Sequence, residues 1–230
     1  VLNSVYKYIL MGDNGSGSQN DACYAGLPGY CMYYDLTGAD IMSTTNYGGS
    51  PEMCYRAAPE RTQSTGDYSK RIWVNMYKAI NQANIILDAL PDATGEDSEK
   101  NDLKGQCLAI RGICYFNLIM NYQQTYAIAK DKRGVILRTS SSDPESMGFS
   151  TVQQCYDQIL KDLKEAKTLL AGYDRTDMWR LNADVVSGQL ARVYQVMGDW
   201  SNALSEAKSV YDKYNTLMTE NEWYSGFDNF

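Results

Sequence analysis

The sequence predicts an all-α protein of TPR-like helical-hairpin repeats, an α-α superhelix, with long irregular loops. From Ser69 onward, apolar residues recur at helical spacing in one segment after another. Proline or glycine separates these segments, at Pro91, Gly172 and Gly198. The last two segments resemble a tetratricopeptide unit. We therefore divide the chain into a loop-rich N-terminal segment, 1–68, packed on a TPR-like helical domain, 69–230.

The first strongly periodic segment predicts a helix over 69–90. Trp73, Tyr77, Ile80, Asn84 and Leu87 fall on one arc of about 80° at 100° per residue. An asparagine therefore lies within an apolar stripe, where an unpaired amide would cost about 1–3 kcal/mol. We favour a structural anchor that ties a neighbouring loop's backbone to this helix over a ligand contact.

The second helix is expected over 96–125 and is apolar on more than one face, which predicts that it is buried on several sides. Cys107 and Cys114 lie on one face of it, and we favour small buried hydrophobes over reactive thiols. A connector follows at 126–149, in which 133–137 has an extended pattern. Asp162, Glu165 and the acidic residues near 96–99 are interpreted as helix-face or first-turn charges.

The next helix is predicted over 150–171. Ser150 and Gln153 have the spacing of a capping box, Phe149 is placed for a hydrophobic staple, and Gly172 ends the pattern.

The last pair is predicted over 182–197 and 200–214, followed by an irregular aromatic tail. Ala191, Ala203 and Ala207 would allow two antiparallel helices to approach closely. Tyr194 and Trp200 are expected to fill the space that these alanines leave.

Residues 1–68 carry weaker helical signals, at Leu2–Leu10 and within 22–42, between polar and glycine-rich loops. The loop at 43–67 contains the candidate ligand-binding residues Asn46, Tyr47, Tyr55 and Arg56. Aromatic faces beside amides and charged donors suit sugars. The alternative is that the tyrosines only hold the loop against the helices.

Composition excludes several classes of function. The chain of 230 residues contains no histidine, which removes Ser-His-Asp, Cys-His and His-ligated metal sites. Its 28 acidic and 21 basic residues give a net charge of −7, which argues against nucleic-acid or anionic-membrane binding. Residues 13–24 do not fit an EF-hand loop, and no carboxylate pair resembles an acid–base couple. We therefore expect that the protein is not an enzyme and that it binds neither a metal ion nor a cofactor.

The residues themselves do not decide the cellular compartment in which the protein works. Cys23, Cys31 and Cys54 lie in loop-rich sequence, and whether they form a disulfide stays open. No apolar run is long enough to span a membrane. The chain begins at Val1 without a signal-peptide pattern, so we expect a trimmed or mature fragment.

Four motifs in order resemble the SusD/RagB family of nutrient-binding outer-membrane lipoproteins of Bacteroidetes. The pattern W-x3-Y-x2-I-x2-A-N is matched by Trp73, Tyr77, Ile80, Ala83 and Asn84. R-A-x2-Y-F-x-L is matched by Arg111, Tyr115, Phe116 and Leu118, with Gly112 in place of the alanine. The third motif runs from Tyr156 to Leu170 and the fourth from Leu190 to Ala207. We assign as structural anchors Trp73, Tyr77, Asn84, Arg111, Tyr115, Tyr194 and Trp200.

The resemblance implies a non-catalytic protein, lipid-anchored through an N-terminal cysteine outside this chain, on the outer face of the outer membrane. It would hold a glycan or other nutrient and pass it to a SusC-like TonB-dependent transporter. The C-terminal half of the family fold is expected to lie outside this chain. The alternative from the residues alone is a TPR-like protein–protein interaction scaffold without sugar binding.

Overall fold

The computed structural model describes residues 2–11, 26–37, 67–175 and 177–225. Within these ranges the chain is helical, and its extended pairing is one isolated antiparallel bridge between Arg133 and Thr151. The longer helices are α1 (Leu2–Met11), α2 (Gly26–Thr37), α5 (Asp67–Ala89), α6 (Asp97–Tyr122), α8 (Val152–Leu169), α9 (Ala183–Met197) and α10 (Trp200–Tyr211). Short helical turns lie at η2 (Leu90–Asp92), α7 (Tyr126–Ala129) and α11 (Glu220–Tyr224). The all-α, TPR-like prediction is confirmed.

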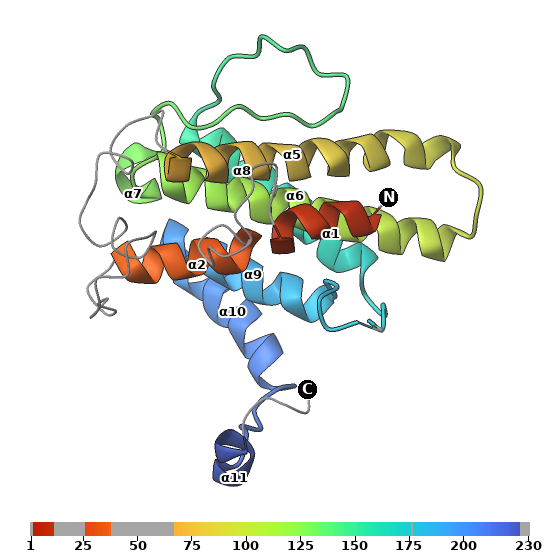
Figure 1. Ribbon diagram of the computed structural model, residues 1–230, viewed down its shortest axis with the longest axis vertical. Coiled ribbons are helices and arrows are strands. Elements are labelled where there is room, and N and C mark those ends of the chain that lie inside the picture. The colour runs from red at the N-terminus through yellow and green to blue at the C-terminus, as the bar shows by residue number, and fades with distance from the viewer. Residues whose placement is uncertain (1, 12–25, 38–66, 176, 226–230) are drawn as a thin grey trace.

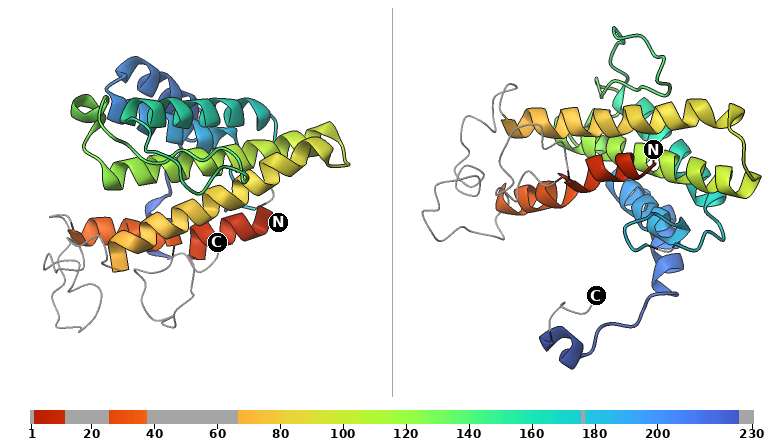
Figure 2. Two further views of the ribbon diagram at one scale, coloured as in Figure 1. Left: turned by 90° about the horizontal axis from the view of Figure 1, so that it is seen from above. Right: turned by 45° about the vertical axis from the view of Figure 1, so that its right-hand side comes forward.

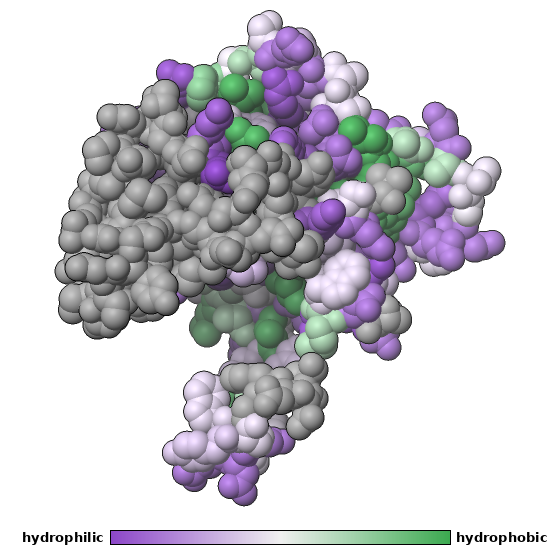
Figure 3. Space-filling model, in the orientation of Figure 1, coloured by the Kyte–Doolittle hydropathy of each residue, from purple (hydrophilic) through white to green (hydrophobic). Residues whose placement is uncertain are grey.

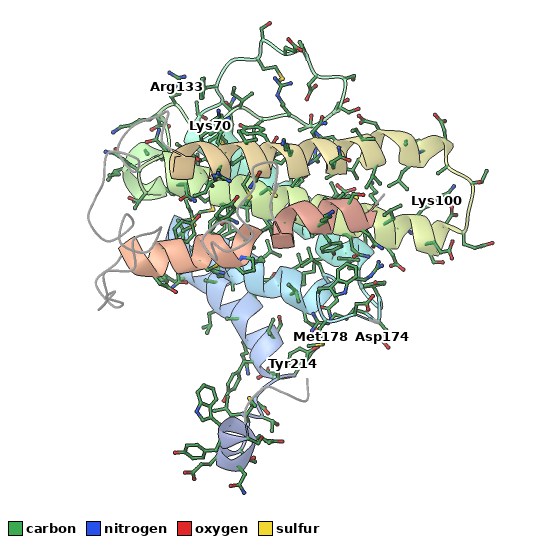
Figure 4. The ribbon with its side chains drawn as sticks, in the orientation of Figure 1. Lys70, Lys100, Arg133, Asp174, Met178 and Tyr214 are labelled. Atoms are coloured by element: carbon green, nitrogen blue, oxygen red, sulfur yellow. The ribbon has the colours of Figure 1, made fainter. Side chains whose placement is uncertain are left out.

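Helix α6 is the centre of the bundle and packs between α5 and α8 (Figure 1). Lys70, near the start of α5, and Lys100, near the start of α6, lie at opposite ends of the pair, so the two helices are antiparallel (Figure 4). Helix α8 then packs on α9, and α9 on α10. Consecutive antiparallel helices therefore stack in the manner of helical-hairpin repeats.

The core gathers around α6, where an unbroken run from Gly105 to Phe116 is buried. Cys107 and Cys114 are both 0% exposed, so the interpretation as small buried hydrophobes is confirmed. At Gly105 and Gly112, α6 lies close to leucines at the end of α8 and within it, Leu170 and Leu163. A Cβ at Gly112 would meet the Leu163 Cγ at 2.9 Å, which explains why glycine fits here in place of alanine.

Helix α1 lies against α5 and α2 (Figure 2). The Tyr6 hydroxyl donates to Gln106 Oε1 on α6 at 2.7 Å and accepts from the Leu181 backbone N–H at 3.0 Å. One buried tyrosine thus joins the N-terminal helix to the centre of the bundle and to the segment before α9. The division at residue 68 stays a prediction.

The start of α8 differs from the prediction by one residue. The capping box is formed by Thr151 and Gln154, where the sequence predicted Ser150 and Gln153. The reason is that the Ser150 backbone is already paired with the connector: it accepts from the Gly134 N–H and donates to the Val135 carbonyl. The predicted staple is also wrong, because Phe149 is 43% exposed and its ring lies under the Arg133 guanidinium, with Cζ 3.4 Å from the centroid.

Two further predictions need correction at the C-terminal end. Trp200 does not fill space between helices: it begins α10 and is 67% exposed. The tail predicted to be irregular contains α11, whose Thr219 and Glu222 form a capping box. In Figure 3, apolar surface (green) shows over the region of α9 and α10, and α11 stands apart below the body.

None of the helices in the described ranges combines the length and the apolar character that crossing a bilayer would require.

Candidate functional site

The connector between α7 and α8, residues 130–149, is held against α5 and α6 by two tyrosines. The Tyr77 hydroxyl donates to the Ile136 carbonyl at 2.7 Å and accepts from the Ile136 N–H at 3.0 Å. Tyr115 does the same for Arg138, at 2.7 and 2.6 Å. Residues two apart in an extended chain direct their backbone N–H and C=O groups to the same side. The two tyrosine hydroxyls therefore make the hydrogen bonds that a neighbouring strand would otherwise make. Burial raises the pKa of both phenols, which therefore stay neutral donors.

A buried polar network lies beneath this attachment. Asn84 is 1% exposed; its amide donates to the Arg138 carbonyl at 3.0 Å, and its Oδ1 accepts from Arg111 Nη1 at 2.8 Å. Arg111 also donates to the Thr139 carbonyl at 3.0 Å. Asn84 therefore makes a loop-to-helix tie of the kind expected for an anchor.

Arg111 is also half of a buried ion pair with Asp162 on α8. Its Nε and Nη2 each lie 2.7 Å from a different carboxylate oxygen, and the two side chains are 7% and 1% exposed. Burial raises the pKa of Asp162, while hydrogen bonds from Arg111 and Gln158 oppose that rise. The interpretation of Asp162 as a helix-face charge is wrong, because the carboxylate faces inward to the arginine that crosses from α6.

The outer part of the connector, residues 138–149, is organised by its own side chains. The Arg138 guanidinium donates to three successive carbonyls, of Asp143 (3.3 Å), Pro144 (3.0 Å) and Glu145 (2.8 Å). The Asp143 carboxylate accepts from the N–H groups of Thr139 (2.7 Å) and Ser140 (3.1 Å). This segment forms the upper loop in Figure 1.

Asp88 on α5 fixes the far corner of that loop. Its Oδ2 accepts from the N–H and the hydroxyl of Ser141, both at 2.7 Å, and from the Ser140 hydroxyl at 3.0 Å. These hydrogen bonds hold the pKa of Asp88 below its usual value, so the corner is fixed by a carboxylate at neutral pH.

A groove of about 640 Å³ lies between α5 and this loop. Its lining residues are Trp73, Val74, Tyr77, Lys78, Asn81, Gln82, Ile136, Arg138 and Glu145. In Figure 4, Arg133, where the connector leaves α7, lies at the same end of the molecule as Lys70, near the start of α5. The groove follows α5 away from that end.

Trp73 has rings on two sides. Its centroid lies 4.8 Å from that of Tyr77 and 5.0 Å from that of Tyr122, and the second contact is edge-to-face. These contacts fix its orientation. Two of the predicted anchors, Trp73 and Tyr77, thus also line the groove.

The predicted ligand residues Asn46, Tyr47, Tyr55 and Arg56 lie outside the described residues, as do Cys23 and Cys54. Of the cysteines in the described ranges, Cys31, Cys107, Cys114 and Cys155 are free thiols.

Tyr194, another predicted anchor, is buried on α9, with Lys164 Nζ 5.7 Å from its ring centroid. No group of three potential metal ligands occurs among the residues with defined positions.

The sequence did not predict this groove: it singled out only Trp73 and Tyr77 among the lining residues, and only as structural anchors. The polar groove residues that it missed include Asn81, Gln82, Arg138 and Glu145. The two amides could have been found, because they continue the helical face of Val74 and Lys78 beside the apolar stripe. The two connector residues carry no such signal, since the loop's position depends on contacts with α5 and α6 that are distant in sequence.

Residues 36–195 match a SusD-like sequence family described as "Starch-binding associating with outer membrane". The chain belongs to this SusD-like family. The resemblance inferred from the four motifs is thereby confirmed, and the family is one associated with the outer membrane. Among curated proteins, none matches this sequence significantly.

Solved structures agree with this membership. A SusD-like carbohydrate-binding protein from Bacteroides vulgatus is 28% identical, with a TM-score of 0.83 over 98% of this chain and 46% of that one. A SusD superfamily protein from Bacteroides thetaiotaomicron is 25% identical, with a TM-score of 0.73 over 96% and 47%. A laminarin-binding SusD-like protein shares the fold at 20% identity, with a TM-score of 0.70 over 100% and 48%. This SusD-like chain spans about half the length of these structures.

Proposed function

We propose that this SusD-like chain belongs to a non-catalytic cell-surface protein that captures a glycan or other nutrient. The protein would deliver its ligand to a SusC-like TonB-dependent transporter, from the outer face of the outer membrane, held by an N-terminal lipid anchor. The observation that supports this proposal most strongly is the match to the family over 36–195. The similarity to a SusD-like carbohydrate-binding protein at 28% identity supports it as well.

The loop at 43–67 remains our proposed primary ligand surface, with Asn46, Tyr47, Tyr55 and Arg56 as contacts. Tyrosine rings can stack on the C–H faces of a sugar, while amide and guanidinium groups exchange hydrogen bonds with its hydroxyls. The proposed task is capture and release, which needs no catalytic group.

The test is calorimetric titration of the protein with a panel of oligosaccharides, alongside Tyr47→Ala and Tyr55→Ala. We expect at least one sugar to bind, and loss of either ring to weaken binding by about 1–3 kcal/mol. A panel in which no sugar binds would contradict glycan capture. Binding that both variants leave unchanged would remove the loop from the site.

One observation favours a second candidate, a protein–protein interaction scaffold. Trp200 and Leu204, 67% and 68% exposed, border a groove between α9 and α10 that also contains Ala191, Ala203 and Ala207. Exposed apolar side chains beside alanines suit a packed protein partner. Co-purification of a TonB-dependent transporter with the protein, without affinity for any sugar, would favour this candidate over glycan capture.

A further inference from the structure

The groove beside α5 has an apolar floor bordered by hydrogen-bonding groups. Trp73, Val74, Tyr77 and Ile136 supply the aromatic and aliphatic surface. A pyranose ring has a weakly polar C–H face and a hydroxyl-rich edge, so it needs both kinds of surface close together. We propose that this groove is a second carbohydrate subsite, separate from the loop at 43–67, and that it takes a neutral sugar unit of an oligosaccharide. This proposal rests on the proposed glycan-binding function.

Three groups along the groove are suited to hydroxyls. Asn81, Gln82 and Glu145 have no side-chain hydrogen bond within the described ranges, although all three line the groove. An amide both donates and accepts, and a carboxylate accepts from two sites. Together they match a ligand whose every hydroxyl is donor and acceptor at once.

The charges favour a neutral sugar over an acidic one. The groove contains two cations, but the Arg138 guanidinium is already directed at three backbone carbonyls. Lys78 likewise has an interaction partner within the protein. The Glu145 carboxylate faces the same space and would repel a uronate. An acidic sugar would therefore meet a like charge and no uncommitted arginine fork.

The outer wall of the groove is fixed before any ligand arrives. Arg138 holds the carbonyls of 143–145, Asp143 caps the N–H groups of 139 and 140, and Asp88 binds Ser141. A segment without regular secondary structure is thus bound at three separate points. Pre-ordering a wall lowers the conformational entropy lost on binding, which is how a shallow groove can hold a sugar.

The test blocks the groove without touching its supports. Asn81 is exposed on α5, so Asn81→Arg places a long side chain over the floor. The matched control is Asn101→Arg, the same change at an exposed position of α6 outside the groove. Titrations would use laminarihexaose, maltohexaose, xylohexaose and mannohexaose as neutral probes and a galacturonic-acid hexamer as the acidic one. The thermal midpoint of each variant verifies that it is folded.

We expect a neutral hexasaccharide to bind the unaltered protein and to bind Asn81→Arg about tenfold or more weakly, with Asn101→Arg within about twofold. Binding that Asn81→Arg leaves unchanged would overturn the subsite and leave the proposed function standing. Groove-dependent binding of the galacturonate alone would overturn the assignment to neutral sugars. Failure of every sugar to bind the unaltered protein would instead overturn the proposed function, and the subsite with it.

Discussion

Replacing Asp162 with asparagine should be among the most damaging single changes in this protein. The substitution keeps the size of the side chain but removes the charge that balances Arg111. The pair is bidentate, with both N–O distances at 2.7 Å, and the Asp162 side chain is 1% exposed. The amide would also direct its own N–H groups at a guanidinium that only donates.

A buried charge that loses its partner costs about 3–5 kcal/mol. Total unfolding free energies are about 5–15 kcal/mol, so Asp162→Asn should remove a large share of the stability. For a chain of this size the thermal midpoint should fall by about 6–20 °C. The assay is urea unfolding followed by helical circular dichroism, with thermal melts as a second measure.

The control is Asp157→Asn, the same change at an exposed position of α8. Its effect should stay within about 0.5 kcal/mol. The double replacement Arg111→Met with Asp162→Leu should cost less than the sum of its two single changes, because the double variant leaves no unpaired charge. If Asp162→Asn lowered the free energy of unfolding by less than about 1 kcal/mol, the view that Arg111 depends on a buried partner charge would be refuted.

Three further predictions concern the connector and the core. Tyr77→Phe leaves a connector N–H and C=O without their partner and should cost about 1–3 kcal/mol in urea unfolding, with faster amide exchange at 135–139 as its signature. Gly134→Ala should cost about 1–3 kcal/mol, since the new Cβ would lie 3.0 Å from the Thr151 backbone; unchanged stability would show that the connector is not held so closely. Burial raises the pKa of the Cys114 thiol to about 12, so at pH 8 a thiol reagent should label exposed Cys31 and leave Cys114 unlabelled until the protein unfolds.

The helices could be predicted from the sequence because each carries its own periodic signal. The stripe from Trp73 to Leu87 predicted only the edge of the buried face of α5: Ile80 and Asn84 are buried, whereas Trp73, Tyr77 and Leu87 are half-buried. The fully buried face lies beside this stripe, at Ile72, Met76, Ala79 and Ala83. The broad apolar surface near Cys107 predicted that α6 is central. Helix ends were less predictable. The cap of α8 moved to Thr151 because Ser150 pairs with the connector, and a local capping pattern contains no information about that pairing.

The groove could be predicted only in part. Its α5 wall follows the helical period, but its other wall depends on Tyr77 and Tyr115 binding a connector about 20 to 60 residues away in sequence. Asp162 shows the same limit. Its spacing fits an ordinary charge on a helix surface, and only the packing of α8 on α6 shows that it meets Arg111.

Carbohydrate capture is tested most directly by hydrogen–deuterium exchange of the protein with and without the tightest-binding oligosaccharide of the panel. We predict that the sugar slows amide exchange in the connector segment 136–145, where backbone groups lie outside regular helices. We also predict slower exchange in the loop at 43–67. Exchange that slows over α9 and α10 instead, or nowhere in this chain, would contradict carbohydrate capture by these surfaces.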